Sequence, residues 1–214
     1  IALGAQMMGA GPAAMNGGHM MAALIALVVT LITGVWIAVA WHRYVLLSEE
    51  PTTALPPFMG DKMGAYFFKA LLIGIVVVVL SVILGMIVGL VAMPLFSAGV
   101  GFIAMLLIAL LVQVPMIFVG LRLAAALPGT AIGVDHGFLA GWEATADDWK
   151  SILQLSVIMA LAVWVLNLIG IFIFGGVSIV AQLWSLIVGW PVMMVGLSIL
   201  TTLYGHYIQK RPLV

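Results

Sequence analysis

The distribution of charge along this chain constrains its fold more than any motif does. The chain has seven basic and seven acidic residues, and they fall in alternate gaps between five long apolar stretches. These clusters lie around 43–69, around 122–150 and at 210–211, whereas the gaps around 94–99 and 174–178 carry no charge. Five membrane crossings would therefore place every charged residue on one side. The positive-inside bias predicts that this side, and the carboxyl terminus with it, is cytoplasmic.

The composition excludes a water-soluble domain. Only 7% of the residues are charged and 65% are hydrophobic, and the mean hydropathy is +1.34. A soluble domain averages about a quarter charged and about half apolar residues. The formal net charge is zero, so no basic field favours nucleic acid. Cysteine is absent, which excludes disulfides, thiolate metal sites and cysteine nucleophiles.

The apolar stretches predict an all-α, polytopic transmembrane bundle. A hydrocarbon core of about 30 Å needs about 20 helical residues, and five stretches are long enough, at about 20–47, 65–93, 99–127, 151–174 and 177–208. Membrane strands would alternate in polarity, and these runs do not. We expect Pro94 to end the second span and Pro128 the third. The segment 135–150 is expected to contain a short amphipathic helix in the cytoplasmic interface.

The two parts of the predicted domain organisation differ in composition. Residues 20–214 form a single transmembrane domain, and residues 1–19 form a Met- and Gly-rich segment on the non-cytoplasmic side. This segment has no Lys or Arg, so it lacks the basic region of a signal peptide. The chain opens with Ile1, and a further span upstream would make six. Thioethers with imidazole suit Cu(I), so a remote hypothesis is copper binding by Met7, Met8, Met15, His19, Met20 and Met21.

A cluster of aromatic and basic residues ends the first span. Trp41, His42, Arg43 and Tyr44 have the character of an interface anchor, because aromatic rings and cations gather at the headgroup level. The alternative is a pH-sensitive contact or a ligand role for His42. Lys69 and Arg122 lie near the ends of other spans, and we expect their side chains to snorkel toward the headgroups.

The second span carries small residues at four-residue spacing, namely Ser81, Gly85 and Gly89. Such a face allows close helix packing in lipid. The partner is either another helix of this chain or a separate subunit, and the sequence leaves both open.

Polar residues deep in the spans are few. Gln113 precedes Pro115 in the third span, and a proline there frees a carbonyl that needs a partner. Asn167, Gln182 and the pair Trp190-Pro191 are the other candidates. Each is expected to satisfy a kink or bond a neighbouring helix, and the alternative is a lining role in a substrate cavity.

Signs of catalysis and of cofactors are missing from the sequence. No Asp, Glu, Lys or Arg lies in the middle third of any span, which argues against ion-coupled transport, and no histidine lies at the mid-depth that a haem ligand requires. Phosphate-binding glycine loops, HExxH and G-x-S-x-G are absent. We therefore expect no catalytic residue, no metal site and no cofactor.

Two segments carry a resemblance to known proteins. They are Trp41-His42-Arg43-Tyr44-Val45-Leu46-Leu47 followed by Glu49-Glu50-Pro51, and Leu139-Ala140-Gly141-Trp142-Glu143-Ala144-Thr145 before Trp149; the ending Leu203-Tyr204 before a basic tail is also similar. In these the chain resembles uncharacterised multi-span proteins of alphaproteobacteria, loosely related to the membrane domain of glycerophosphoryl diester phosphodiesterases. The resemblance implies six spans, a bacterial inner membrane and a scaffold without catalytic residues.

These features favour a non-catalytic accessory, scaffold or assembly subunit of a larger membrane complex. Its expected partners are membrane lipids and other integral membrane subunits, not nucleic acid. The alternative function is a transporter or lipid-handling protein with a cavity near Gln113, Asn167 and Gln182.

Overall fold

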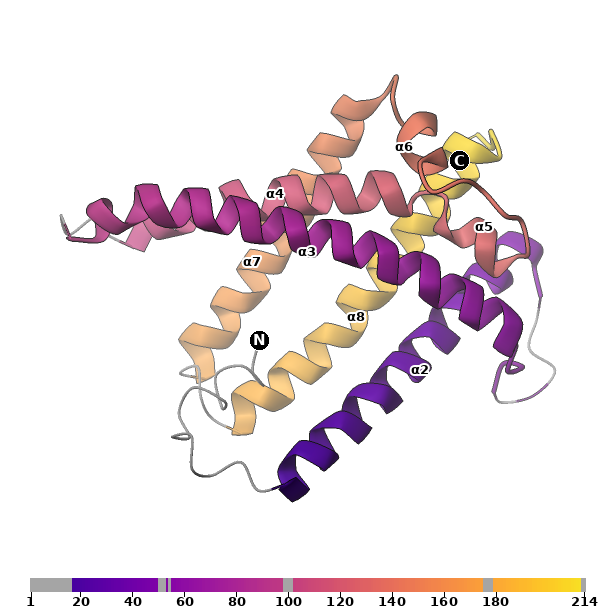
Figure 1. The fold of residues 1–214 in the computed structure, drawn as a ribbon, viewed down its shortest axis with the longest axis horizontal. Coiled ribbons are helices and arrows are strands. Elements are labelled where there is room, and N and C mark those ends of the chain that lie inside the picture. The colour runs from indigo at the N-terminus through magenta and orange to yellow at the C-terminus, as the bar shows by residue number, and fades with distance from the viewer. Residues whose placement is uncertain (1–16, 50–52, 54, 98–101, 175–178, 213–214) are drawn as a thin grey trace.

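The described part of the protein is helical. The computed structural model describes residues 17–49, 53, 55–97, 102–174 and 179–212, and no strand occurs among them. Five helices are long and apolar enough to cross a membrane, which confirms the predicted all-α transmembrane class. They are α2 (Gly17–Leu47), α3 (Gly60–Ser97), α4 (Phe102–Ala124), α7 (Trp149–Phe174) and α8 (Ile179–Leu203) (Figure 1).

Three short helices complete the described structure. Helices α5 (Leu127–Ala131) and α6 (Ala140–Ala144) lie between α4 and α7, and α6 falls within the segment where a short interfacial helix was expected. One turn of π-helix, η1 (Tyr204–Ile208), follows α8, and the Gln209 amide bonds the Tyr204 carbonyl at 3.1 Å across it.

Several helix ends differ from those predicted. Helix α3 begins at Gly60, before the expected start near 65, and Asp61 in its first turn interacts favourably with the helix dipole. It also continues through Pro94 to Ser97; a proline this close to the end of a helix disturbs only the last turn. Pro128 starts α5 and does not end α4, since the first turn of a helix has no use for the missing N–H.

The charges gather at one end of the bundle, as the sequence predicts. We call it the charged end: it comprises the carboxyl-terminal ends of α2, α4 and α8, the amino-terminal ends of α3 and α7, and α5, α6 and η1 (Figure 1). Every charged residue that the structure describes lies on these parts of the chain or on the loops between them.

The packed core also lies at the charged end. All five residues of α5 are buried, and α5 contacts α2, α3, α4, α8 and η1. The core around it takes residues from every long helix except α7, including Val39, Tyr66, Leu123 and Leu197. A second cluster places Ile152 of α7 against Leu121, Ala125 and Leu203.

The opposite halves of the helices, which we call the apolar end, are much less packed. From the charged end, α3 diverges from α2 and α8 (Figure 1). Leu90 of α3 is 77% exposed, Phe172 of α7 74% and Leu186 of α8 73%. Close packing among the described residues also occurs there: the Trp184 indole bonds the Leu166 carbonyl at 3.4 Å, beside the buried Gly170, and Ala92 of α3 is buried.

Candidate functional site

His42 is the centre of a buried hydrogen-bond chain. Its ring is fully buried, with Nδ1 2.8 Å from the Thr201 hydroxyl and Nε2 3.2 Å from the Tyr66 hydroxyl. Thr201 donates its own proton to the Leu197 carbonyl at 2.7 Å, so it accepts from Nδ1–H. Nε2 is then free to accept from Tyr66. A neutral ring satisfies every group in this chain, which joins α2, α3 and α8.

Arg122 joins the end of α4 to α6. Only 7% of the residue is exposed, and its guanidinium donates to the Thr145 hydroxyl at 3.0 Å and the Trp142 carbonyl at 2.7 Å. The same group lies 3.8 Å from the centre of the Trp142 ring. Helix α6 can approach so closely because Gly141 has no side chain: a Cβ there would lie 2.5 Å from the Arg122 carbonyl oxygen.

Lys69 and His136 connect α3 to the loop after α5. The Lys69 ammonium lies 3.1 Å from the Asp135 carboxylate and donates to the His136 carbonyl at 2.6 Å. The His136 ring in turn contacts the Tyr204 hydroxyl at 3.1 Å. Gly129 of α5 lies beneath this pair, where a Cβ would come within 2.5 Å of the His136 ring.

Asp148 links the start of α7 to η1. Its carboxylate accepts hydrogen bonds from the Ser151 hydroxyl at 2.6 Å and from the Tyr207 hydroxyl at 2.5 Å. These two donors, Ser151 first, hold the pKa of Asp148 below its usual range. Because hydrogen bonds to the charged form favour it, this carboxylate stays ionised and bonded over the physiological range.

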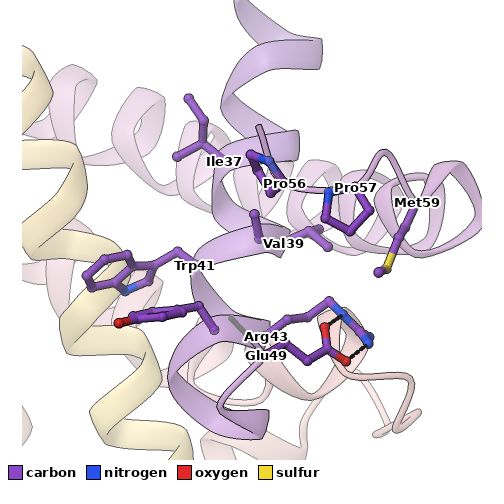
Figure 2. Close-up of a pocket in the computed structure, with 10 residues that line it drawn as sticks. Ile37, Val39, Trp41, Arg43, Glu49, Pro56, Pro57 and Met59 are labelled. Carbon is purple, nitrogen blue, oxygen red and sulfur yellow. Dashed lines mark hydrogen bonds and ion pairs between the residues drawn. The ribbon is translucent and has the colours of Figure 1, made fainter. Parts of the chain in front are cut away.

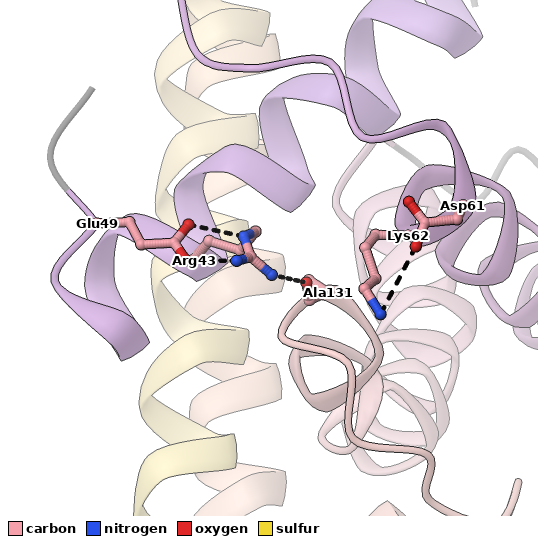
Figure 3. Close-up of polar contacts among 5 residues, drawn as sticks. All are labelled: Arg43, Glu49, Asp61, Lys62 and Ala131. Atoms are coloured by element: carbon pink, nitrogen blue, oxygen red, sulfur yellow. Dashed lines mark hydrogen bonds and ion pairs between the residues drawn. The ribbon is translucent and has the colours of Figure 1, made fainter. Parts of the chain in front are cut away.

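An ion pair lies at the end of α2. Arg43 makes a bidentate pair with Glu49 through Nε and Nη2, and its Nη1 donates to the Ala131 carbonyl at 3.1 Å. In Figure 3 the Arg43 side chain extends between Glu49 and Ala131. It thereby places a cation at the carboxyl-terminal end of α5, which the helix dipole favours.

The Arg43–Glu49 pair lies in the wall of a groove with a volume of about 770 Å³. The groove lies between the last turns of α2 and the loop that leads into α3 (Figure 2). Its remaining lining is mainly apolar: Ile37, Val39, Ala40, Trp41, Tyr44, Pro56, Pro57 and Met59. We call it the Arg43 groove. It combines a charged pair with an apolar surface at the end of a membrane-spanning helix.

A second, smaller groove of about 360 Å³ lies between α2 and α3. It starts from the same loop, with Phe58 and Gly60, and continues along α2 from Val35 to Val28, toward the apolar end. No charged residue lines it. We call it the Phe58 groove.

The four residues of the predicted interface anchor have separate surroundings. Tyr44 is 49% exposed, as an anchor requires, and Trp41 is partly buried against the core. The Trp41 indole nitrogen is buried and has no hydrogen-bond partner within the described residues. Arg43 is paired, and His42 turns into the bundle. Lys69 and Arg122 also turn inward to form contacts, where snorkelling was expected.

The polar and proline candidates at depth are not brought together around either groove. Asn167 is exposed and donates to the Val163 carbonyl of its own helix at 2.8 Å. Gln182, Trp190 and Pro191 are exposed on α8, whereas Gln113 and Pro115 are half-buried in α4. A cavity lined by these residues stays a prediction, as do the kinks.

The small-residue face of α3 is open. A Cβ added at Gly85 or Gly89 would meet nothing within 4 Å, and the Ser81 hydroxyl donates to the Val78 carbonyl of its own helix at 2.7 Å. Neither glycine is therefore used for close packing against the described parts of the other helices.

The proposed copper ligands Met7, Met8 and Met15 fall outside the described residues, as does Glu50. Met20 and Met21 are exposed at the start of α2. Across the described ranges, no group of three or more His, Asp or Glu side chains could hold a metal ion.

Sequence reasoning missed Tyr66, Thr145, Thr201, Tyr204 and Tyr207 as polar partners in the charged end. Each lies near the end of an apolar span, where a hydroxyl side chain has no local signature. Their partners are distant in sequence: His42 and Thr201 are 159 residues apart.

Comparison with family models, with curated proteins and with solved structures returns no match to this chain.

Proposed function

We propose that this protein is a non-catalytic integral membrane subunit that supports or assembles a larger membrane complex. The observation that carries the proposal is the unequal packing of the bundle. At the charged end, hydrogen bonds between side chains join the ends of α2, α3, α7 and α8, and others join α4 to α6. Within the described residues, the long apolar faces of α3, α7 and α8 stay uncovered.

The open face of α3 supports an assembly role in particular. Helices associate in lipid through small residues that let backbones approach, because no hydrophobic force drives them together. Ser81, Gly85 and Gly89 form such a face, and among the described residues nothing packs closely against the two glycines. A helix of a partner subunit would fit there.

The proposed location is a bacterial inner membrane, with the charged end and the carboxyl terminus in the cytoplasm. The chain has no cysteine, so single cysteines report sidedness without a background. Gly18→Cys and Asp147→Cys lie at exposed positions on opposite ends of the bundle. A membrane-impermeant maleimide added to intact spheroplasts should label the first and not the second, and the reverse pattern would refute the orientation.

The assembly role can be tested by photo-crosslinking. Benzoylphenylalanine replaces Leu90 or Leu186, which are exposed at the apolar end. Its placement at Asp147, which is exposed at the charged end, serves as the matched control. After mild solubilisation, we expect Leu90 or Leu186 to give a reproducible adduct with one defined membrane protein. Gly85→Leu should abolish the Leu90 adduct while the chain itself stays folded.

The opposite result is equally clear. If the chain migrates as a free monomer and the apolar-end positions give only lipid adducts, the accessory role is wrong.

A transporter or lipid-handling protein is the second candidate, and the Arg43 groove is the observation in its favour. Gln113→Leu and Asn167→Leu test the cavity predicted for it. If both variants leave growth and solute or lipid flux unchanged, that cavity has no role.

A further inference from the structure

The Arg43 groove has the chemistry of a phospholipid site. It lies at the last turns of the Met20–Leu47 span, the level at which headgroups meet a transmembrane helix. Its volume of about 770 Å³ lies within the range of about 300–1,000 Å³ that is usual for small-molecule sites. An occupant must match both its charged wall and its apolar lining.

Arg43 retains hydrogen-bonding capacity in the groove. A guanidinium carries five N–H donors in a planar fork. The bonds to Glu49 and Ala131 use one donor each on Nε, Nη1 and Nη2, which leaves one on Nη1 and one on Nη2. The side chain is 14% exposed. Two adjacent donors of this kind match two oxygens of a phosphate group.

Glu49 restricts the class of headgroup. Its side chain is 42% exposed, and its carboxylate has lone pairs beyond the two that Arg43 uses. It would repel a headgroup that is only anionic, and it would accept hydrogen bonds from an ammonium group. A quaternary ammonium has no N–H to donate. The pair therefore matches a phosphate joined by a short linker to a primary ammonium.

The apolar lining of the groove matches the acyl chains of such a lipid. Ile37, Pro56, Pro57 and Met59 line the same groove as the charged pair, and in Figure 2 Val39 lies between Ile37 and that pair. The same loop leads into the Phe58 groove, which is uncharged and continues along α2 toward the apolar end. The two grooves share no lining residue, so an acyl chain of the occupant would lie against the apolar residues of the Arg43 groove itself.

We propose that the Arg43 groove binds one phosphatidylethanolamine molecule as a structural lipid. The phosphate accepts from the two spare N–H groups of Arg43, the ammonium donates to Glu49, and an acyl chain lies against α2. This site does not depend on the accessory role, because a lipid can occupy it whether or not a partner subunit binds.

Native mass spectrometry of the purified full-length protein tests the proposal. The protein is mixed with equal amounts of phosphatidylethanolamine, phosphatidylcholine and phosphatidylglycerol of identical acyl chains. We expect phosphatidylethanolamine to be retained about tenfold over each of the others, equivalent to about 1.4 kcal/mol. Free phosphoethanolamine in excess should not displace it. Equal retention of the three lipids, or displacement by the free headgroup, would overturn the site.

Variants separate the contributions of the two charges. Glu49→Gln should remove the discrimination against phosphatidylglycerol, and Arg43→Gln should remove retention of all three lipids. Asp147→Asn changes an exposed acid outside the groove and should leave the pattern unchanged. Ala40→Leu adds three carbons to the groove wall with the ion pair intact and should weaken retention, so the test survives if Arg43→Gln fails to fold. An unaltered lipid preference in Ala40→Leu and Glu49→Gln would refute the assignment.

Discussion

The two ends of this bundle differ in how many of their side chains find partners within the chain. At the charged end, His42 and Arg122 are buried, and both have polar partners from other elements. At the apolar end, Leu90 and Leu186 are more than two-thirds exposed, and the helices diverge. The charged end specifies the arrangement of the helices. The apolar end leaves surface that lipid or other proteins must cover.

This difference has a physical cause. In lipid, apolar side chains gain little from touching one another, so long Leu- and Val-rich faces do not force helices together. Buried polar groups gain much from finding partners, because an unpaired group costs about 1–3 kcal/mol. Side chains that carry polar groups are concentrated near the span ends, and the helices pack most closely where these groups bond one another.

The largest expected effect comes from a methyl group placed between α4 and α6. In Gly141→Ala the new Cβ would meet three backbone atoms, the nearest at 2.5 Å, and backbone cannot move aside as a side chain can. We expect a loss of about 3 kcal/mol, the upper part of the usual cost of overpacking. Denaturant titration in detergent, followed by circular dichroism, measures it.

A matched control lies in the same region. Gly137→Ala adds the same methyl group where nothing lies within 4 Å, and it should be nearly neutral. Equal stability of the two variants would show that α4 and α6 are not packed as described.

The second effect concerns the His42 chain. His42→Leu leaves the Tyr66 hydroxyl without its acceptor in a buried position, and we expect a loss of about 2 kcal/mol. The double variant His42→Leu/Tyr66→Phe removes both polar partners and should recover part of that loss. A double variant that loses the full sum of the single effects would contradict a direct bond between them.

The third effect is a pH dependence from Asp148. Its pKa is depressed in the folded state by the Ser151 and Tyr207 hydroxyls. The associated stability is therefore present above the unfolded pKa of about 3.9 and is lost as the pH falls through the folded value. Ser151→Ala should destabilise the protein at pH 7, and the difference from wild type should vanish in acid. A difference that is independent of pH would exclude this cause.

A methyl group placed at the apolar end should change stability least. Gly85→Ala makes the same change as Gly141→Ala, but its Cβ would meet nothing within 4 Å. Stability of the isolated chain should stay within about 0.5 kcal/mol of wild type. A large loss would mean that the face of α3 is already covered by this chain.

The sequence predicts the transmembrane class and the gathering of charges at one end, because hydropathy and charge are properties of local segments. It does not predict which polar residues pair. The neighbours of His42 in the sequence predict an interface anchor. Its burial depends on hydrogen bonds with Tyr66 and Thr201, which lie on two other helices. The sequence also predicts that Pro94 and Pro128 end spans, but both lie within helices, since the cost of a proline depends on its position in the helix.

The His42–Thr201 bond also has a consequence for biogenesis. Its two residues are separated by 159 positions, and at a synthesis rate of about 5–20 residues per second the second emerges about 8–30 s after the first. Until α8 has been inserted, the imidazole of α2 lacks this partner. The first helix must therefore wait in the bilayer for the last, and a chaperone or insertase that shields its polar end would act during that interval.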